Sequence, residues 1–361
     1  MNIRSAELLD QLQLDHPIIQ APMAGVSTPA MAAAVSNAGA LGSLGLGAVN
    51  SESAGDMINT TRTLTRRGFN LNVFCHRPAL ADPAVESAWL MRLRPEFQQF
   101  GAEPPPTLRE IYKSFLDDDD MLNLFVMMRP AAVSFHFGLP APEQLELLHG
   151  AGVFLMASAT SLDEARTIAE AGMDAVIAQG YEAGGHRGVF DPDKPDDRLG
   201  TLALTRLLVK ELDIPVIAAG GIMDGAGIAA ALQLGAAAAQ LGTAFIDCPE
   251  SLADLGYRAA LKSEAAHHTE MTAVISGRPA RSLPNRFTRW GRNATLEEIP
   301  EYPIAYDAAK ALHTAAKNKS EFGYGAQWAG QGAPLVRSLP AADLVRELAC
   351  ELEEVHDTYR P

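Results

Sequence analysis

The sequence has few cysteines, no long apolar run and no excess of positive charge. Its three cysteines, Cys75, Cys248 and Cys350, lie far apart, which argues against a disulfide framework or a clustered metal motif and fits a reducing compartment. No run reaches the roughly 18 apolar residues that a membrane-spanning helix needs. Residues 1–22 contain no apolar signal core. We therefore expect a soluble, cytoplasmic protein without a membrane partner.

Positive charge is scarce: 29 Lys and Arg residues face 44 Asp and Glu residues, for a formal net charge of -15 and a pI near 5.0. This balance argues against a nucleic-acid partner or an acidic membrane surface. It permits an anionic small ligand where the pocket itself is locally positive. With 361 residues, 47% of them hydrophobic, the chain is long enough for two average domains or one large α/β barrel.

Eight short apolar runs alternate with alanine-rich helical stretches. The runs lie at 17–25, 40–47, 69–74, 131–138, 152–158, 174–180, 214–221 and 236–245. Parallel strands need a crossover between them, so this alternation predicts eight βα units. Eight units match a (β/α)8 (TIM) barrel better than an open doubly wound sheet, which would usually carry a GxGxxG motif after its first strand.

Two regions do not follow the βα repeat. We predict a barrel over residues 1–250, interrupted after the third strand by a polar, proline-bearing insertion at about 76–128. We expect residues 251–335 to form a mostly helical cap or small second domain over the barrel mouth, and residues 336–361 to form a C-terminal helix that packs on the barrel. The Asp117–Asp120 run is interpreted as a solvated face and not as a metal site, because adjacent carboxylates diverge on a helix. No metal is expected.

Glycines at the ends of the seventh and eighth strands indicate a phosphate site. In such barrels the active site lies at the C-terminal ends of the strands, which also places Pro22 and Met23 there. Gly220, Gly221 and Gly242 let backbone amides approach an anion closely, and Thr243 adds a hydroxyl. The alternative is that these glycines only make tight turns.

Three amide side chains at other strand ends suit a flat heterocycle. Asn72, Gln179 and Gln240 each offer donors and acceptors, as the edge of an isoalloxazine requires. Together with a phosphate site, they favour FMN over a bare phosphate ligand.

Two histidines lie at strand ends, in contrasting contexts. His186 lies in a glycine-rich segment, "QGYEAGGHRG", that brings the backbone near a ligand, with Glu182 as a candidate orienting acceptor. It could act as a base or, when protonated, as a cation for an anionic substrate; the alternative is an ordinary surface residue. His136 lies between two phenylalanines, so a packed structural role competes with substrate binding.

Several motifs, in order, resemble the nitronate monooxygenase family, formerly called 2-nitropropane dioxygenases. They are "QAPMAG…AAAVSNAGALGSLG", "NLNVF", "SFHFG", "QGYEAGGHRG", "PVIAAGGI" and "AAAAQLGTAF", and the resemblance runs from about residue 15 to 335. It implies a TIM barrel with non-covalent FMN and no metal. It also implies oxidation of alkyl nitronates by molecular oxygen, propionate 3-nitronate foremost, with a detoxifying role.

The resemblance also assigns roles to individual residues. It implies FMN contacts at Asn72, Gln179, Gly184, Gly221 and Gln240 to Thr243, which includes Leu241, and it makes His186 the base that deprotonates a neutral nitroalkane. The segment "EYPIAYDAAKAL" resembles the part of the class I enzymes that lines the substrate pocket. Tyr302, Tyr306 and Lys310 are spaced four residues apart, which predicts one helical face.

Two alternatives stay open. The first is an NAD(P)H-dependent FMN reductase acting on quinones or an enoyl thioester, which would share the glycine pattern and the histidine loop. The second is a flavin-binding protein without turnover, such as a sensor. The tyrosine and lysine face and the form of the His186 loop favour the monooxygenase, as a monomer or homodimer that uses a small nitronate and oxygen.

Overall fold

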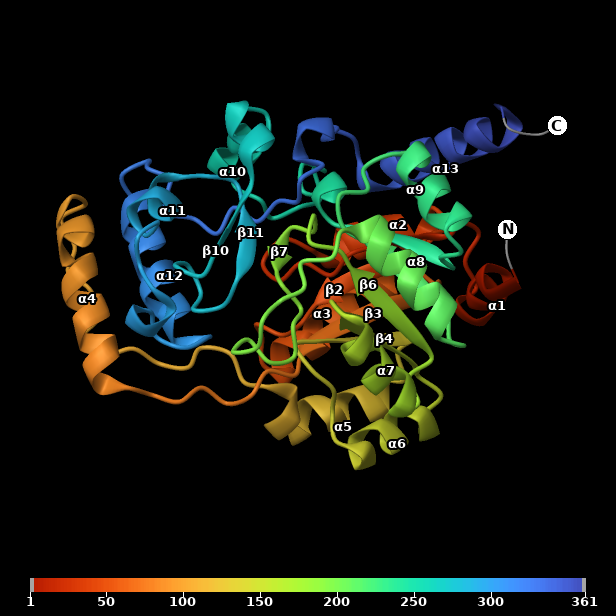
Figure 1. Ribbon diagram of the computed structural model, residues 1–361, viewed down its shortest axis with the longest axis horizontal. Helices are drawn as coiled ribbons and strands as arrows, with labels where there is room; N and C mark the ends of the chain where they lie inside the picture. Colours follow the sequence, from red (N-terminus) through yellow and green to blue (C-terminus); the bar gives the residue numbers. More distant parts are fainter. Residues whose placement is uncertain (1–2, 359–361) are drawn as a thin grey trace.

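Eight parallel strands form the main sheet of the computed structural model, which describes residues 3–358 (Figure 1). The strands are β1 (Ile18–Gln20), β2 (Gly42–Gly45), β3 (Phe69–Phe74), β4 (Ala132–His136), β5 (Phe154–Ala159), β6 (Ala175–Gln179), β8 (Val216–Ala219) and β9 (Ala238–Leu241). Their spatial order is β1-β9-β8-β6-β5-β4-β3-β2. The eight strands predicted from the apolar runs are confirmed.

The sheet is nearly closed into a barrel, and a short bridge joins its two ends. Leu41, just before β2, donates its N–H to the Ile18 carbonyl at 3.0 Å and accepts from the Gln20 N–H at 2.9 Å. At the other end of the strands, helix α1 (Ile3–Leu12) buries Leu8 and Leu12 against the lower barrel interior. The C-terminal ends of the strands are therefore the side on which a cavity can open.

Helices cover the outside of the barrel in the alternation that the sequence predicts. They are α2 (Pro29–Asn37), α3 (Ser51–Leu64), α5 (Asp119–Met128), α6 (Pro142–Gly150), α7 (Leu162–Glu170), α8 (Thr201–Glu211) and α9 (Gly225–Gln233). Side-chain caps fix several of their starts: Thr28 accepts from the Met31 N–H at 3.0 Å, and Asp224 accepts from the Gly227 N–H at 2.8 Å. Helix α13 (Ala341–Thr358) packs against α9 and α2 (Figure 1); the last residues of the predicted C-terminal segment, 359–361, lie outside the described residues.

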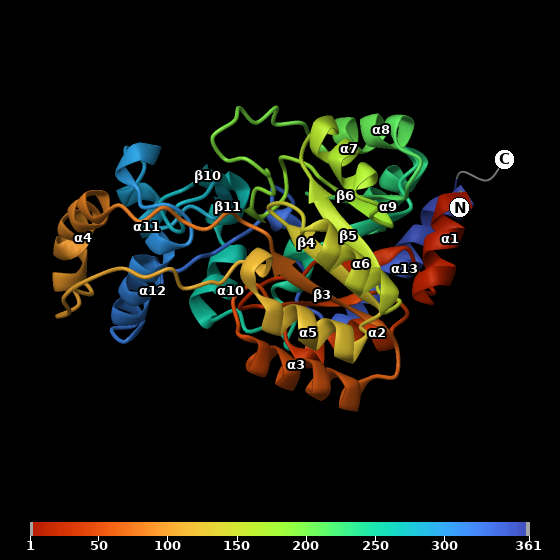
Figure 2. The ribbon, with the colours of Figure 1, turned by 90° about the horizontal axis from the view of Figure 1, so that it is seen from below.

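The region predicted as one insertion divides into two parts. Helix α4 (Pro83–Gln98) lies away from the barrel beside α11 (Arg286–Trp290) and α12 (Ile304–Lys317) (Figures 1 and 2). Helix α5 instead packs between α3 and α6 as the barrel's own helix after β3. The predicted boundary 76–128 was therefore wrong at its C-terminal end. Within the aspartate run, Asp118 caps α5 by accepting from the Met121 N–H at 3.3 Å.

The cap has its own hydrophobic core, separate from the barrel interior. Buried side chains of α4 meet those of α12 and of the segments around them: Trp89, Leu90, Leu93, Phe97, Val274, Ile275, Phe287, Ile304, Ala305, Ala308, Leu312 and Tyr324. A short 3-10 turn, η4 (Leu296–Glu298), and helix α10 (Leu255–Leu261) complete this side. The insertion therefore contributes a helix to the cap.

A small antiparallel sheet joins the barrel to the cap. It consists of β10 (Glu270–Thr272), β11 (Ala280–Ser282) and β7 (Gly185–His186), with β11 in the middle. His186 pairs with Ala280 and Gly185 with Arg281. The prediction of a mostly helical region 251–335 was thus incomplete, because the region contains two strands that pair with each other, and one of them, β11, also pairs with a barrel loop far away in the sequence. Among residues 3–358, no helix has the length and apolarity to cross a bilayer.

Candidate active site

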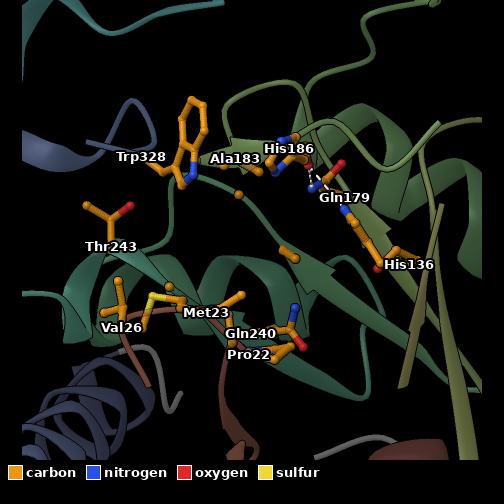
Figure 3. Close-up of a pocket in the computed structure, with 18 of the residues that line it drawn as sticks. Pro22, Met23, Val26, His136, Gln179, Ala183, His186, Gln240, Thr243 and Trp328 are labelled. Atoms are coloured by element: carbon orange, nitrogen blue, oxygen red, sulfur yellow. Dashed lines mark hydrogen bonds between the residues drawn. The ribbon is translucent and has the colours of Figure 1, made fainter. Parts of the chain in front are cut away.

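A cavity with an empty volume of about 1330 Å³, its open mouth included, lies at the C-terminal ends of the barrel strands under the cap. It brings together fourteen of the sixteen predicted site residues: Pro22, Met23, Asn72, His136, Gln179, Gly184, His186, Gly220, Gly221, Gln240, Gly242, Thr243, Tyr302 and Tyr306. Figure 3 shows His136, Gln179 and His186 along one side, with Thr243 on the other. Residues as far apart in the sequence as Pro22 and Tyr306 thus line one pocket.

Backbone amides gather at the end of the cavity formed by β8 and β9. Gly220 and Gly221 have φ angles of 125° and 72°, a region that side chains disfavour. Within residues 3–358, the N–H groups of Gly221, Gly242 and Thr243 donate to no protein acceptor. The Thr243 hydroxyl accepts from the Gly330 N–H at 2.9 Å, which ties this end to the cap. A concave group of free amides fits a phosphate.

Amide oxygens face the cavity farther along the barrel. Gln240 Oε1 is buried and has no hydrogen-bond partner among the described residues. Asn72 uses its Nδ2 for the Ser134 carbonyl and hydroxyl, each at 3.0 Å, and keeps its Oδ1 free of protein donors in the described chain. Such acceptors fit the N–H groups of a flat heterocycle. The residues present therefore fit an FMN: the free amides at the ends of β8 and β9 would suit its phosphate, and the amide oxygens of Gln240 and Asn72 would suit its ring.

Gln179 also holds the loop that follows β6. Its Nε2 donates to the His186 carbonyl at 2.9 Å, and its Oε1 accepts from the Gly188 N–H at 2.7 Å (Figure 3). Both ends of the amide are thus used to hold the loop after β6. Gln179 thus lines the cavity and also fixes the position of His186.

His186 is held by contacts from three separate segments. Its Nε2 lies 2.8 Å from the Ser276 hydroxyl of the cap, and its carbonyl lies 3.2 Å from His136 Nε2 besides the bond from Gln179. The predicted orienting role of Glu182 is wrong. Its carboxylate accepts from the Thr201 N–H and hydroxyl at 2.8–3.0 Å and so fixes the start of α8. Ser276, which sequence reasoning did not single out, takes the place next to the imidazole.

Burial keeps the histidines of the site neutral. It lowers the pKa of His186 from 6.5 to about 3, with smaller contributions from His136, Arg278 and His76. Burial likewise lowers the pKa of His136 to about 4. At pH 7 both rings are therefore uncharged. A neutral ring can accept a proton, but a pKa this low makes His186 a weak base until an anion binds beside it.

Aromatic rings form the wall next to His186. The His186 ring centroid lies 5.3 Å from that of Tyr302, 6.2 Å from Tyr306 and 5.1 Å from Trp328. Tyr112, from the segment between α4 and α5, lies 5.7 Å from Tyr306, edge to face. Burial raises the pKa of Tyr306 to about 12, so this wall is uncharged.

Three details of the wall differ from the sequence predictions. Tyr302 precedes α12, which begins at Ile304, so it does not share a helical face with Tyr306 and Lys310. The sequence analysis did not predict Tyr112 or Trp328 as site residues. Tyr112 lies in the polar insertion, which has no hydrophobic periodicity. Trp328 lies in the "GYGAQWAGQG" segment, whose only distinguishing feature in the sequence is its glycine and glutamine content.

Two predicted site residues do not line the cavity. Leu241 is 1% exposed and packs in the core outside the barrel, because alternate strand residues point away from the interior. Lys310 is exposed, and its Nζ lies 4.7 Å from the Tyr112 ring centroid and 5.4 Å from that of Tyr306. Its ammonium group therefore lies behind the two tyrosine rings and does not line the cavity.

The fold and site define a barrel enzyme whose cavity has free backbone amides at one end and a neutral histidine in an aromatic wall. The family model described as nitronate monooxygenase matches residues 5–351, and the chain belongs to this family.

Individual relatives agree with that assignment. The chain is 63% identical over 353 residues to the nitronate monooxygenase of Paraburkholderia phytofirmans, covering 98% of this chain and 96% of the relative. It is 54% identical over 341 residues to that of Pseudomonas aeruginosa, covering 94% and 97%. Among solved structures, nitroalkane oxidase from Streptomyces ansochromogenes matches with a TM-score of 0.90 at 39% identity, covering 98% and 99% of the chains. FabK from Thermotoga maritima matches with a TM-score of 0.74 at 28% identity, covering 98% and 97%.

The buried histidines predict a pH dependence of stability. His76, behind Tyr302, is 1% exposed, and burial lowers its pKa from 6.5 to about 4. Between these two values the unfolded chain binds a proton that the folded chain does not, so the free energy of unfolding falls as the pH falls through that range. We expect His76→Phe to make this fall shallower by up to about 1.4 kcal/mol per pH unit.

Urea unfolding at several pH values between 4 and 7 measures this slope. His267→Gln, at an exposed histidine, is the matched control and should keep the wild-type slope. Equal slopes for His76→Phe and wild type would show that His76 titrates alike in the folded and unfolded chains.

Proposed function

We propose that the protein is an FMN-dependent nitronate monooxygenase that uses oxygen to convert alkyl nitronates to the carbonyl compound with nitrite or nitrate. Propionate 3-nitronate is the proposed principal substrate, and detoxification the proposed role. The observation that carries the proposal is the cavity itself. It places free backbone amides and unpaired amide oxygens suited to FMN opposite a neutral histidine in an aromatic wall.

The protein's own groups would bind and position the reactants. Gly221, Gly242 and Thr243 would hold the FMN phosphate, and Gln240 and Asn72 would hold its ring. When bound, FMN supplies the electron transfer between nitronate and oxygen. The rings of Tyr302, Tyr306 and Trp328 would exclude water from the side where His186 lies.

The neutral protonation state of the His186 ring favours a nitronate over a neutral nitroalkane as the substrate. A nitronate is already deprotonated, so it needs no strong base, and the neutral imidazole can orient it. Its negative charge would raise the pKa of the nearby imidazole, because an opposite charge stabilises the protonated form. A neutral nitroalkane would have to give its proton to a ring whose pKa burial has lowered to about 3.

Oxygen uptake by the purified, flavin-loaded protein tests the proposal. We expect rapid uptake with propionate 3-nitronate and none with NADH or NADPH. A nucleotide-dependent FMN reductase is the second candidate, because it would share the glycine pattern and the histidine loop. Flavin reduction by NADH or NADPH without nitronate turnover would establish that reductase and overturn the monooxygenase.

His186→Asn tests the proton-accepting role. The variant should keep its flavin, because the contacts proposed for FMN come from other residues. Its kcat/KM for a neutral nitroalkane should fall by about 100-fold or more, the usual contribution of a general base, and its kcat/KM for the nitronate should fall much less. Equal losses on the two substrates would remove His186 from the role of base.

Thr243→Ala tests the phosphate end of the cavity. Loss of the hydroxyl removes a donor beside the free amides and the bond to the Gly330 N–H, so flavin retention through gel filtration should fall. Thr243→Ser keeps the hydroxyl and should retain flavin at the wild-type level. Unchanged flavin content in Thr243→Ala would place the phosphate elsewhere.

A further inference from the structure

Arg278 is a buried cation to which the proposed mechanism gives no role. It belongs to the "SGRPARS" segment that leads into β11, and it is 3% exposed. Its guanidinium donates to the Val189 carbonyl, but its Nε has no partner and it makes no ion pair within residues 3–358. A buried charge without a counter-ion is costly, so proteins keep one mainly where it serves a site.

The guanidinium stacks on a buried ring behind the aromatic wall. Arg278 Cζ lies 4.2 Å from the Phe137 ring centroid. The same ring lies 4.5 Å from His136, 5.7 Å from His186 and 5.4 Å from Tyr302, measured between centroids. Only the Phe137 ring therefore separates the positive charge from three residues that line the cavity.

Phe137 has a backbone conformation that suggests functional constraint. Its φ angle is 74°, in the left-handed region that a bulky side chain enters only at a cost. Strain of this kind persists where the surrounding structure imposes it, commonly at functional sites. Here it keeps the ring between the guanidinium and the histidines.

The cavity has few other sources of positive charge. His136 and His186 are neutral near pH 7, and Lys310 lies outside the lining. The protein as a whole carries a formal charge of -15. An anionic substrate therefore needs a local cation. Among the described residues, Lys310 lies behind the Tyr112 and Tyr306 rings but is exposed to solvent, which screens its charge, whereas Arg278 is buried behind the wall next to His186.

We propose that Arg278, stacked on Phe137, is the counter-cation that draws an anionic nitronate to the His186 side of the cavity without touching it. This inference rests on the proposed function, because it names the charge that selects the anionic form of the substrate. Arg278 is thus a positioning residue that acts through the electrostatic potential of the wall.

Arg281 provides a matched control three residues away. It is also 3% exposed, but its Nε and both terminal nitrogens bond to the Tyr181 carbonyl and to Thr269. Its guanidinium faces the Tyr181 ring at 4.9 Å and not Phe137. Arg281→Met therefore removes a buried arginine from the same strand region without removing the charge behind the His186 wall.

The test measures nitrite binding to the flavin-loaded protein by calorimetry, and nitronate kinetics beside it. Nitrite is a small anion with two oxygens on nitrogen, and its binding requires no turnover. Arg278→Met should weaken nitrite binding about tenfold, the order expected for one charge several ångströms away inside a protein. Arg278→Lys, which keeps the charge, should recover most of this loss, and Arg281→Met should bind nitrite as the wild type does.

Steady-state kinetics should show the same pattern as a KM effect. In Arg278→Met the KM for propionate 3-nitronate should rise about as much as the nitrite Kd, with little change in kcat. Unchanged nitrite affinity in Arg278→Met overturns the inference. So does an equal loss in Arg278→Lys, which would make Arg278 a structural brace. If the wild type binds nitrite but does not oxidise nitronates, the proposed function fails while the titration still decides whether Arg278 attracts anions.

Discussion

The two-residue pairing of β7 with β11 is the contact on which the site depends. It joins the loop after a barrel strand to the cap, with His186 opposite Ala280. Without it, the Ser276 hydroxyl would not reach the imidazole, and the wall of Tyr302, Tyr306 and Trp328 would not stand beside it. The barrel supplies the floor that fits FMN, and the cap supplies the side that fits substrate.

The arrangement of the barrel and the cap around the cavity also explains its electrostatics. The cap covers the His186 ring, and the resulting burial is the main reason why the pKa of the ring is low. A neutral histidine suits a substrate that arrives deprotonated. In our proposal, the positive charge that such an anion requires comes from Arg278, which lies behind the aromatic wall, and not from a residue that lines the cavity. An acidic protein can in this way bind an anion in a largely uncharged pocket.

The barrel and most of the cavity lining could be predicted from the sequence because their signals are local. Apolar runs, crossover helices and glycines after strands mark positions that the barrel topology then brings to one mouth. Pro22, Asn72, Gln240 and Thr243 were found in this way. The family resemblance, and not periodicity, pointed to Tyr302 and Tyr306.

The errors arose where tertiary contacts decide the outcome. Strand β7 forms only because β11 lies beside it, and nothing in the local sequence distinguishes α5 from the insertion before it. Glu182 is close to His186 in the chain, but the start of α8 takes its carboxylate. Tyr112 could not be found from the sequence, since its place in the wall depends on how the cap folds back over the barrel.

The most direct test of the account is the charge of His186 in the assembled, flavin-loaded protein at pH 7. Nitrogen-15 NMR of histidine-labelled protein, with His186→Asn to assign the signals, reports it. The account predicts a neutral ring, with one nitrogen bearing a proton and one without. A doubly protonated imidazolium at pH 7 would contradict it, because the site would then already hold its own cation beside the substrate.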